Sequence, residues 1–176
     1  MFQRQSFLLI ILVTIFLSLT SCDLFDETIN DPISVDQDSV THIVDLVEIE
    51  NFRSGALEHI LEGEINHQGQ AVGYHYDRLP TKKGEIISGS QTEPNDHGVY
   101  EAKVSVNDIE KTANAGLSTF FPDEWDTQDV VDAINEAYDT KTFISGNTYE
   151  GLTDEGIIIR MYLDDKEKII SAFPIY

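Results

Sequence analysis

The stretch DTQDVVDAINEAYDT (residues 126–140) carries the clearest secondary-structure signal in the chain. Its apolar residues recur at intervals of three and four positions: Val130, Ile134, Ala137 and Tyr138. This spacing places them on one face of a helix. Asp126 or Thr127 can cap its amino end, and Asp129 lies near the positive end of the helix dipole. The stretch therefore predicts an amphipathic helix in the second half of the chain.

Segments with strand character lie on both sides of this helix. GVYEAKVSV (98–106) alternates between polar and apolar residues, as expected of a half-buried strand. GIIIRMYLD (156–164) and KIISAFPI (168–175) flank a polar turn and predict a C-terminal β-hairpin. An earlier helix is predicted around residues 54–62, with Gly63 able to end it. The order helix, strands, helix, hairpin predicts an α+β fold with antiparallel β-sheets and flanking helices.

The first 21 residues are typical of an export signal. Arg4 precedes an apolar run over residues 7–17, which is too short for a comfortable transmembrane helix. LTSC (19–22) resembles the lipobox of bacterial lipoproteins, whose cysteine is lipidated after cleavage. We therefore expect residues 1–21 to be a lipoprotein signal peptide. Acylated Cys22, the only cysteine of the chain, would anchor the protein to a membrane of the bacterial cell envelope. An ordinary signal peptide is the alternative, and the sequence leaves open which membrane is used.

An acidic segment follows Cys22. Residues 23–50 contain nine acidic side chains and no Lys or Arg. Such a composition buries too little apolar surface to offset the entropy of ordering, which predicts a solvated tether over residues 22–50. Its end, VTHIVDLVEIENF (40–52), recovers an apolar periodicity and can already belong to the domain. Residues 51–176 are enough for one domain.

The charge of the chain argues against a general nucleic-acid-binding protein. The net charge is −21, and residues 51–176 contribute −13 of it, from ten basic and 23 acidic side chains. Non-specific binding to nucleic acid depends on the neutralisation of phosphates by Lys and Arg. Any action of this domain on a nucleic acid must therefore depend on a local site.

The stretch LEHILEGEINHQGQAVGYHYD (57–77) contains three of the five histidines: His59, His67 and His75. Imidazole titrates near neutral pH, so one neutral and one protonated ring can remove a proton from one oxygen and donate a proton to another. Gly63 and Gly73 are expected to let the backbone approach a phosphate closely. Ligand spacing such as HExxH is missing from the sequence, and we expect neither a metal nor a cofactor.

Four segments together resemble the bacterial branch of the EndoU endoribonucleases. They are EHILEGEINHQGQAVGYHY (58–76), GVYEAKV (98–104), STFFPDEWDTQDVVDAINEAY (118–138) and IISAFPIY (169–176). The resemblance covers residues 57–176 and implies an EndoU nuclease domain, placed here at 51–176. It implies cleavage of an RNA substrate by attack of the ribose 2′-hydroxyl, which leaves a 2′,3′-cyclic phosphate, often 3′ of uridine.

The resemblance also assigns the catalytic residues. It implies two catalytic histidines, with His75 as the base and His59 as the acid, although the sequence alone does not decide which is which. A lysine completes the family's site, because an amine can stabilise the negative charge of the transition state. Lys111, just before the STFFP segment, is preferred for this role. Lys103 on the predicted strand is the alternative.

Substrate-binding residues are expected in the C-terminal segment. Ser171 occupies the place of the family's Ser or Thr, which hydrogen bonds to the base or the phosphate. Phe173 stands where viral and animal relatives have tyrosine, so it can stack on uracil but lacks the phenol. Tyr176 can supply a phenol instead. These differences leave uridine preference open.

Two other functions are compatible with the sequence. The acidic domain can be a catalytically inactive EndoU-like binding lipoprotein, in which case His59 and His75 need not share a pocket. Related domains also form the C-terminal parts of polymorphic toxins. A toxin role would add an immunity protein to the partners of this chain.

Overall fold

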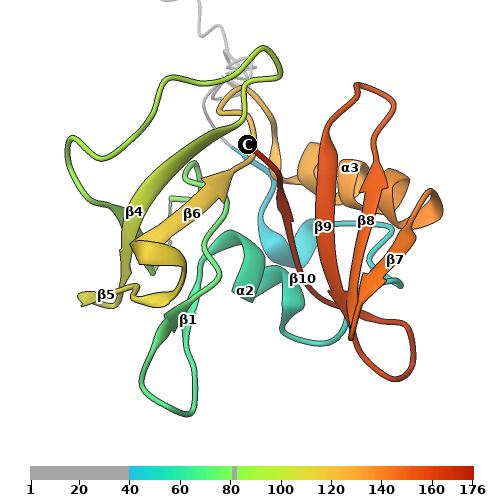
Figure 1. Ribbon diagram of the computed structural model, residues 1–176, viewed down its shortest axis with the longest axis horizontal. Helices are drawn as coiled ribbons and strands as arrows, with labels where there is room; N and C mark the ends of the chain where they lie inside the picture. The colour runs from blue at the N-terminus through green and yellow to red at the C-terminus, as the bar shows by residue number, and fades with distance from the viewer. Residues whose placement is uncertain (1–39, 81–82) are drawn as a thin grey trace, which may run out of the picture. The chain divides into compact units, whose positions relative to one another are not determined.

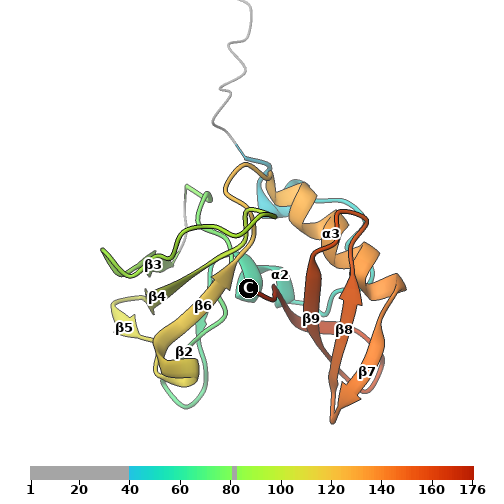
Figure 2. The ribbon, with the colours of Figure 1, turned by 45° about the horizontal axis from the view of Figure 1, so that its top comes forward.

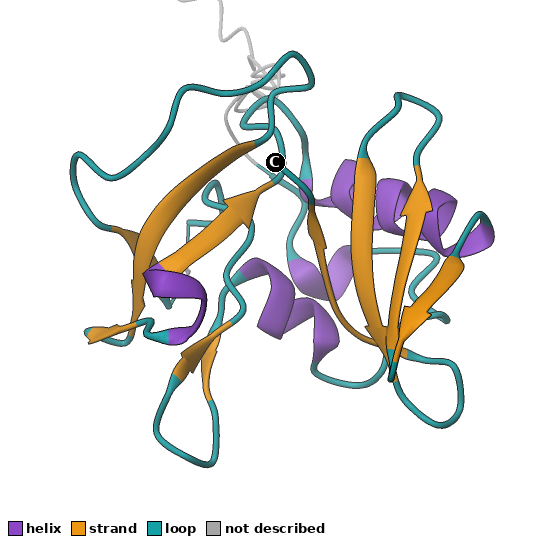
Figure 3. Ribbon diagram, in the orientation of Figure 1, coloured by secondary structure: helices purple, strands orange, loops and turns teal. Residues whose placement is uncertain are grey.

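The computed structural model describes residues 40–80 and 83–176. The predicted signal peptide (1–21), Cys22 and the predicted tether as far as residue 39 lie outside the described residues. The described part confirms the predicted α+β class, with antiparallel sheets, few helices and a C-terminal hairpin (Figures 1 and 3). Within it, no helix combines the length and the hydropathy needed to span a bilayer.

The helix predicted at residues 126–140 is α3, Thr127–Asp139. The Asp129 carboxylate accepts a hydrogen bond of 2.7 Å from the amide of Asp126, which satisfies one of the free N–H groups at the helix start. The apolar face of α3 is buried in the larger hydrophobic core through Val130, Ile134 and other residues. The predicted helix is therefore observed with nearly its predicted bounds.

Helix α3 packs against a four-stranded antiparallel sheet with the strand order β10-β9-β8-β7 (Figure 2). Its strands are β7 Thr142–Ser145, β8 Thr148–Leu152, β9 Ile158–Leu163 and β10 Ile169–Pro174. The chain approaches α3 closely at Gly151, where a Cβ atom would lie 1.8 Å from the carbonyl oxygen of Ala137. Because α3 covers one face of this sheet, the side chains of the other face remain available for a site.

The second sheet is formed around β4, Tyr100–Val106, whose alternating burial agrees with the predicted half-buried strand. Its other strands are β3 Gly84–Ile86, β5 Ile109–Glu110 and β6 Leu117–Phe120, all antiparallel to β4. A short 3₁₀ helix, η2 Ala113–Gly116, connects β5 to β6. A smaller aromatic core supports this sheet and includes Tyr74, Tyr100 and Phe120.

The predicted early helix is α2, Ala56–Leu61, and it lies between the two sheets in both views (Figures 1 and 2). It packs against β10. The chain then forms a two-stranded ribbon from β1 Glu64–Ile65 and β2 Ala71–Val72. This path carries the chain from the core around α3 to the sheet around β4.

The first described residues pack on the helical side of the domain. Val40 and Leu46 are buried in the larger core, on either side of the 3₁₀ helix η1, Ile43–Asp45. The Thr41 amide donates a hydrogen bond of 2.7 Å to the Asp126 carboxylate at the start of α3. Residues 40–50, the end of the predicted tether, are thus packed as part of the domain.

Candidate active site

A pocket of about 660 Å³ has walls from α2, β2, β6, β9 and β10. Five of the six side chains predicted for catalysis and substrate binding line it: His59, His75, Lys111, Ser171 and Phe173. His59 and His75 thus share one pocket, as a catalytic site requires. The hypothesis of a non-catalytic binding protein does not require this arrangement.

At Gly73, the segment that carries His75 lies against the segment that carries His59. The Tyr74 amide donates to the His59 carbonyl at 3.1 Å, and the His75 amide donates to the Ile60 carbonyl at 2.7 Å. Gly73 has φ of +74°, and a Cβ atom there would lie 2.0 Å from the His59 carbonyl oxygen. Only glycine fits this approach. Gly73 was expected to admit a phosphate, but its close neighbour is the backbone of His59.

His75 is held as one tautomer by the backbone. Its Nδ1 lies 2.7 Å from the Thr119 carbonyl oxygen, which can only accept a hydrogen bond. Nδ1 therefore carries the proton, and the Nε2 of the neutral ring carries a free lone pair. Phe173 stacks on the imidazole with ring centroids 5.0 Å apart and an 18° interplanar angle. Burial, followed by the nearby charge of Lys111, holds the pKa of His75 well below its ordinary value.

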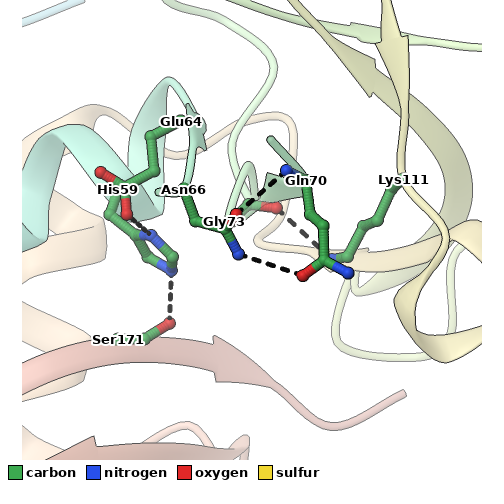
Figure 4. Close-up of polar contacts among 7 residues, drawn as sticks. All are labelled: His59, Glu64, Asn66, Gln70, Gly73, Lys111 and Ser171. Carbon is green, nitrogen blue, oxygen red and sulfur yellow. Dashed lines mark hydrogen bonds and ion pairs between the residues drawn. The ribbon is translucent and has the colours of Figure 1, made fainter. Parts of the chain in front are cut away.

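His59 has a different environment at the end of α2 (Figure 4). Its Nδ1 lies 3.1 Å from Oε1 of Glu64, and its Nε2 lies 3.0 Å from Oγ of Ser171. A carboxylate only accepts hydrogen bonds, so Nδ1 carries a proton. Burial lowers the pKa of His59, while the hydrogen bond and charge of Glu64 oppose that effect. The protonated form of His59 is therefore stabilised by a carboxylate, whereas, among the described residues, that of His75 is stabilised by the Thr119 carbonyl alone.

Lys111 reaches the pocket from the loop between β5 and η2. Its Nζ donates a hydrogen bond of 2.7 Å to Ser118 Oγ and lies 3.5 Å from the Gly73 carbonyl oxygen (Figure 4 draws the Gly73 contact). Ser118 in turn donates to the Gly73 carbonyl at 3.1 Å. Burial lowers the pKa of the Lys111 amine to about 8. Lys103 is exposed and does not line the pocket.

Strands β9 and β10 form the opposite wall. Ser171 pairs with Tyr162 and Phe173 pairs with Arg160 across these strands, so all four side chains share the face opposite α3. Each of them lines the pocket. The rings of Tyr162 and Phe173 lie 6.1 Å apart. Tyr162, which was not among the predicted site residues, therefore brings a phenol into the pocket.

Tyr176, the sixth predicted residue, does not line the pocket. Its hydroxyl donates a hydrogen bond of 3.1 Å to the Glu93 carbonyl, and its side chain is half exposed. The pocket is thus lined by the phenol of Tyr162 and not by that of Tyr176. The signal for Tyr162 lies in the alternation of GIIIRMYLD, where Arg160 and Tyr162 share the polar parity.

The pocket is positively charged within an acidic domain. Of the described charged residues of the domain, the basic Arg53, Lys111 and Arg160 line it, against the acidic Glu64 alone. Arg53 and Arg160 were not predicted for the site. The arrangement can attract a phosphate group although the domain as a whole repels one.

The described residues contain no group of three His, Cys, Asp or Glu side chains that could hold a metal ion. The pocket provides two imidazoles of unequal basicity, one buried amine and several hydroxyls. Such a set can transfer protons and stabilise an anionic transition state.

The chain resembles known proteins over most of its described length. The family described as bacterial EndoU nuclease matches residues 54–176. A relative from Bacillus cereus named "Toxin" is 54% identical over 132 residues, which is 75% of this chain and 24% of the relative. The chain thus aligns with about a quarter of that relative's length. No solved structure matches the chain. The matched segment contains the pocket residues His59, His75, Lys111 and Ser171. The chain belongs to the bacterial EndoU nuclease family.

Proposed function

We propose that this domain is an endoribonuclease. In the reaction, the ribose 2′-oxygen attacks the adjacent phosphorus and the 5′-oxygen of the next nucleotide leaves. The products are a 2′,3′-cyclic phosphate end and a 5′-hydroxyl end. The observation that carries the proposal is the unequal hydrogen bonding of two histidines in one pocket, since the reaction needs one proton acceptor and one proton donor.

His75 would act as the general base. Its Nδ1 donates to a carbonyl, so its Nε2 is available to accept the proton of the 2′-hydroxyl. Its lowered pKa keeps the ring neutral at neutral pH, as a base must be before it acts. Phe173 excludes water from one face of the ring.

His59 would act as the general acid. Glu64 stabilises its charged form, and Ser171 holds Nε2 on the side of β10. A bound phosphate brings a further negative charge close to the ring and raises the pKa of His59, so substrate binding favours the protonated form. The proton on Nε2 would then pass to the leaving 5′-oxygen.

Lys111 would stabilise the charge on the non-bridging oxygens in the transition state. With a pKa of about 8, the amine is mostly protonated at pH 7. Its burial strengthens the interaction with an anion, because the local dielectric is low. Ser118 and the Gly73 carbonyl fix the position of the amine before the substrate arrives.

The test is cleavage of a uridine-containing RNA oligonucleotide by the purified protein, with mass spectrometry of the ends. We expect 2′,3′-cyclic phosphates and no cleavage where the attacking 2′-hydroxyl is replaced by hydrogen. His75→Ala should lower the rate by roughly 10²–10⁴-fold, the usual contribution of a general base. Lys103→Gln is the matched control and should retain activity. Intact RNA at an excess of wild-type protein would refute the proposal.

Base preference would depend on the wall formed by Ser171 and Phe173. Ser171 can hydrogen bond to a base, and the ring face of Phe173 turned away from His75 can contact it. Thr119 also lines the pocket, and its buried Oγ1 has no hydrogen-bond partner among the described residues. We propose a preference for uridine. Equal cleavage rates for the four dinucleotides that differ in the 5′ base would contradict it.

We also propose that lipidated Cys22 anchors the protein to the cell envelope, as the LTSC segment suggests. The Bacillus cereus relative named "Toxin" supports a role in antagonism, with an immunity protein as a partner. Substitution Cys22→Ala should release the protein from the membrane fraction. If a neutralising partner exists, expression of this domain should arrest growth of a bacterium that lacks it. Unchanged growth despite measurable ribonuclease activity would argue against toxicity.

A further inference from the structure

The three cationic side chains that line the pocket, Lys111, Arg160 and Arg53, differ in their hydrogen-bond and ion-pair partners. Lys111 is hydrogen bonded to Ser118 Oγ at 2.7 Å. Arg160 Nε donates to the Glu150 carboxylate at 2.9 Å, across strands β8 and β9. Arg53, in contrast, makes no side-chain hydrogen bond or ion pair with any other described residue, although it lines the pocket. Its charge helps to lower the pKa of the nearby Asp164 carboxyl, but the two form no ion pair, so Arg53 keeps a charge that a ligand can use.

The backbone fixes where Arg53 stands. Its amide donates to the Ile169 carbonyl at 2.9 Å, and its carbonyl accepts from Ala56 at 3.0 Å. These bonds hold the residue between the start of β10 and the start of α2, on the same side of the pocket as His59. In agreement, the charge of Arg53 is among the lesser causes, after burial, that lower the pKa of His59. The exposed side chain can reach a ligand that extends out of the pocket.

We propose that Arg53 binds a second phosphate of the RNA, the one that follows the nucleotide on the 3′ side of the cleaved bond. This rests on the proposed function, in which His59 donates its proton to the leaving 5′-oxygen. A cation on the same side of the pocket as His59 then lies near the RNA strand that begins with this 5′-oxygen. Guanidinium groups bind phosphate through two parallel hydrogen bonds, and Arg53 has no carboxylate to compete for them within ion-pair distance among the described residues.

The size of the pocket agrees with a ligand larger than one scissile group. Its volume of about 660 Å³ lies within the range of about 300–1,000 Å³ found for ligand pockets. Lys111 comes from the loop before η2 and His59 from α2, whereas Arg53 and Ser54 come from the loop before α2. The subsite would thus make the enzyme act faster on a continuing strand than on a dinucleotide.

The experiment compares two substrates that differ only in this phosphate, UpA and UpAp. Wild-type protein should show a kcat/KM for UpAp that is roughly five- to tenfold higher, as expected for one partly exposed charge-assisted contact. In Arg53→Gln the ratio of the two values should fall to about one, and Arg53→Lys should retain part of it. Lys103→Gln, which removes an exposed cation outside the pocket, should keep the wild-type ratio. An undiminished ratio in Arg53→Gln would overturn the subsite.

A binding measurement separates this proposal from the catalytic one. Analogues of both substrates with 2′-deoxyuridine cannot undergo 2′-hydroxyl attack, and their affinities are measured by calorimetry. Tighter binding of the phosphorylated analogue to the wild type, lost in Arg53→Gln, supports the subsite even if no RNA is cleaved. Cleavage of UpA and UpAp at equal rates by the wild type, with equal binding of the analogues, rejects the subsite and leaves the ribonuclease proposal intact.

Discussion

The two sheets contribute to the pocket in different ways. The sheet β7–β10 has α3 packed on one face and presents Ser171 and Phe173 from the other, after a register shift between Ile169 and Ser171 in β10. The sheet around β4 contributes Lys111 from a loop. That loop continues into η2, where Asn114 and Ala115 have left-handed backbone with φ of 51° and 55°.

One sheet therefore supports a wall of the site, whereas the reactive amine of Lys111 comes from a loop beside the other sheet. A strand face fixes the spacing of side chains through backbone geometry, so the β9–β10 wall can be rigid without specific side-chain contacts. The amine of Lys111 depends instead on local contacts with Ser118 and the Gly73 carbonyl. Reactive groups on loops held by a rigid scaffold are common in enzymes. Substitutions in the two regions should therefore have separable effects.

The largest effect is expected at Gly73, where the chain after β2 lies in close backbone contact with α2. Gly73→Ala places a Cβ atom 2.0 Å from the His59 carbonyl oxygen at a φ of +74°. The clash and the strain together should lower the free energy of unfolding by about 3–5 kcal/mol. Because the contact joins the two histidine segments, activity per folded molecule should also fall. Thermal unfolding and RNA cleavage measure the two effects.

Gly151→Ala and Gly69→Ala are the controls for this comparison. A Cβ atom at Gly151 would lie 1.8 Å from the Ala137 carbonyl oxygen, so this variant should lose stability but keep its activity per folded molecule. Gly69 has φ of +77° with no atom within 4 Å of the added Cβ, so only backbone strain of about 1–2 kcal/mol is expected. Equal activity losses in Gly73→Ala and Gly151→Ala would remove the proposed distinction.

Lys111→Met should separate catalysis from stability. The rate of RNA cleavage should fall by roughly 10²–10³-fold, as for other losses of transition-state charge stabilisation. The pKa of Lys111 is lowered to about 8, so the folded state holds this proton less tightly than the unfolded state. At pH 7 the variant should therefore be about 1–3 kcal/mol more stable than the wild type.

The same pKa predicts a pH dependence. Stability of the wild type should gain a contribution as pH rises from about 8, because the unfolded chain still binds the Lys111 proton there and the folded chain does not. Lys111→Met should lack this gain, whereas the exposed-site control Lys103→Met should retain it. Urea unfolding at pH 7 and pH 10 measures both. A Lys111→Met variant that is less stable than the wild type at pH 7 would contradict the expectation.

Phe173→Leu should have the smallest effect and should appear mainly in the pH profile. The substitution removes the ring stacked on His75 and admits water to the imidazole. The pKa of His75 should then rise toward its usual value of about 6.5. Because the base acts when unprotonated, the fall in rate at acidic pH should begin at a higher pH than in the wild type. Tyr176→Phe, outside the pocket, should leave the profile unchanged.

The spacing of apolar residues in the sequence was sufficient to predict the helices and strands that bury one face. The helix predicted at 126–140 is observed at Thr127–Asp139, and the strand predicted at 98–106 is observed at Tyr100–Val106. The hairpin β9–β10 was also predicted. The hairpin β7–β8 was not, because the four residues of β7 are all exposed and show no alternation.

The site depends on contacts that local patterns do not contain. His59 and Ser171 are 112 positions apart in sequence, and His75 and the Thr119 carbonyl are 44 apart. The resemblance to a family pointed to the two histidines, Lys111 and Ser171, which the fold brings into one pocket. Resemblance could not reveal the partners that distinguish the two imidazoles, since these come from β1, β6 and β10 and meet the histidines only in the folded chain.

The buried amine of Lys111 has a consequence for chemical labelling. An amine with a pKa of about 8 is roughly one-tenth free base at pH 7, whereas an ordinary lysine with a pKa of about 10.4 has less than one part in a thousand. The unprotonated form is the nucleophile. An acylating reagent small enough to enter the pocket should therefore modify Lys111 before the solvated lysines of the surface, and a bound oligonucleotide should protect it.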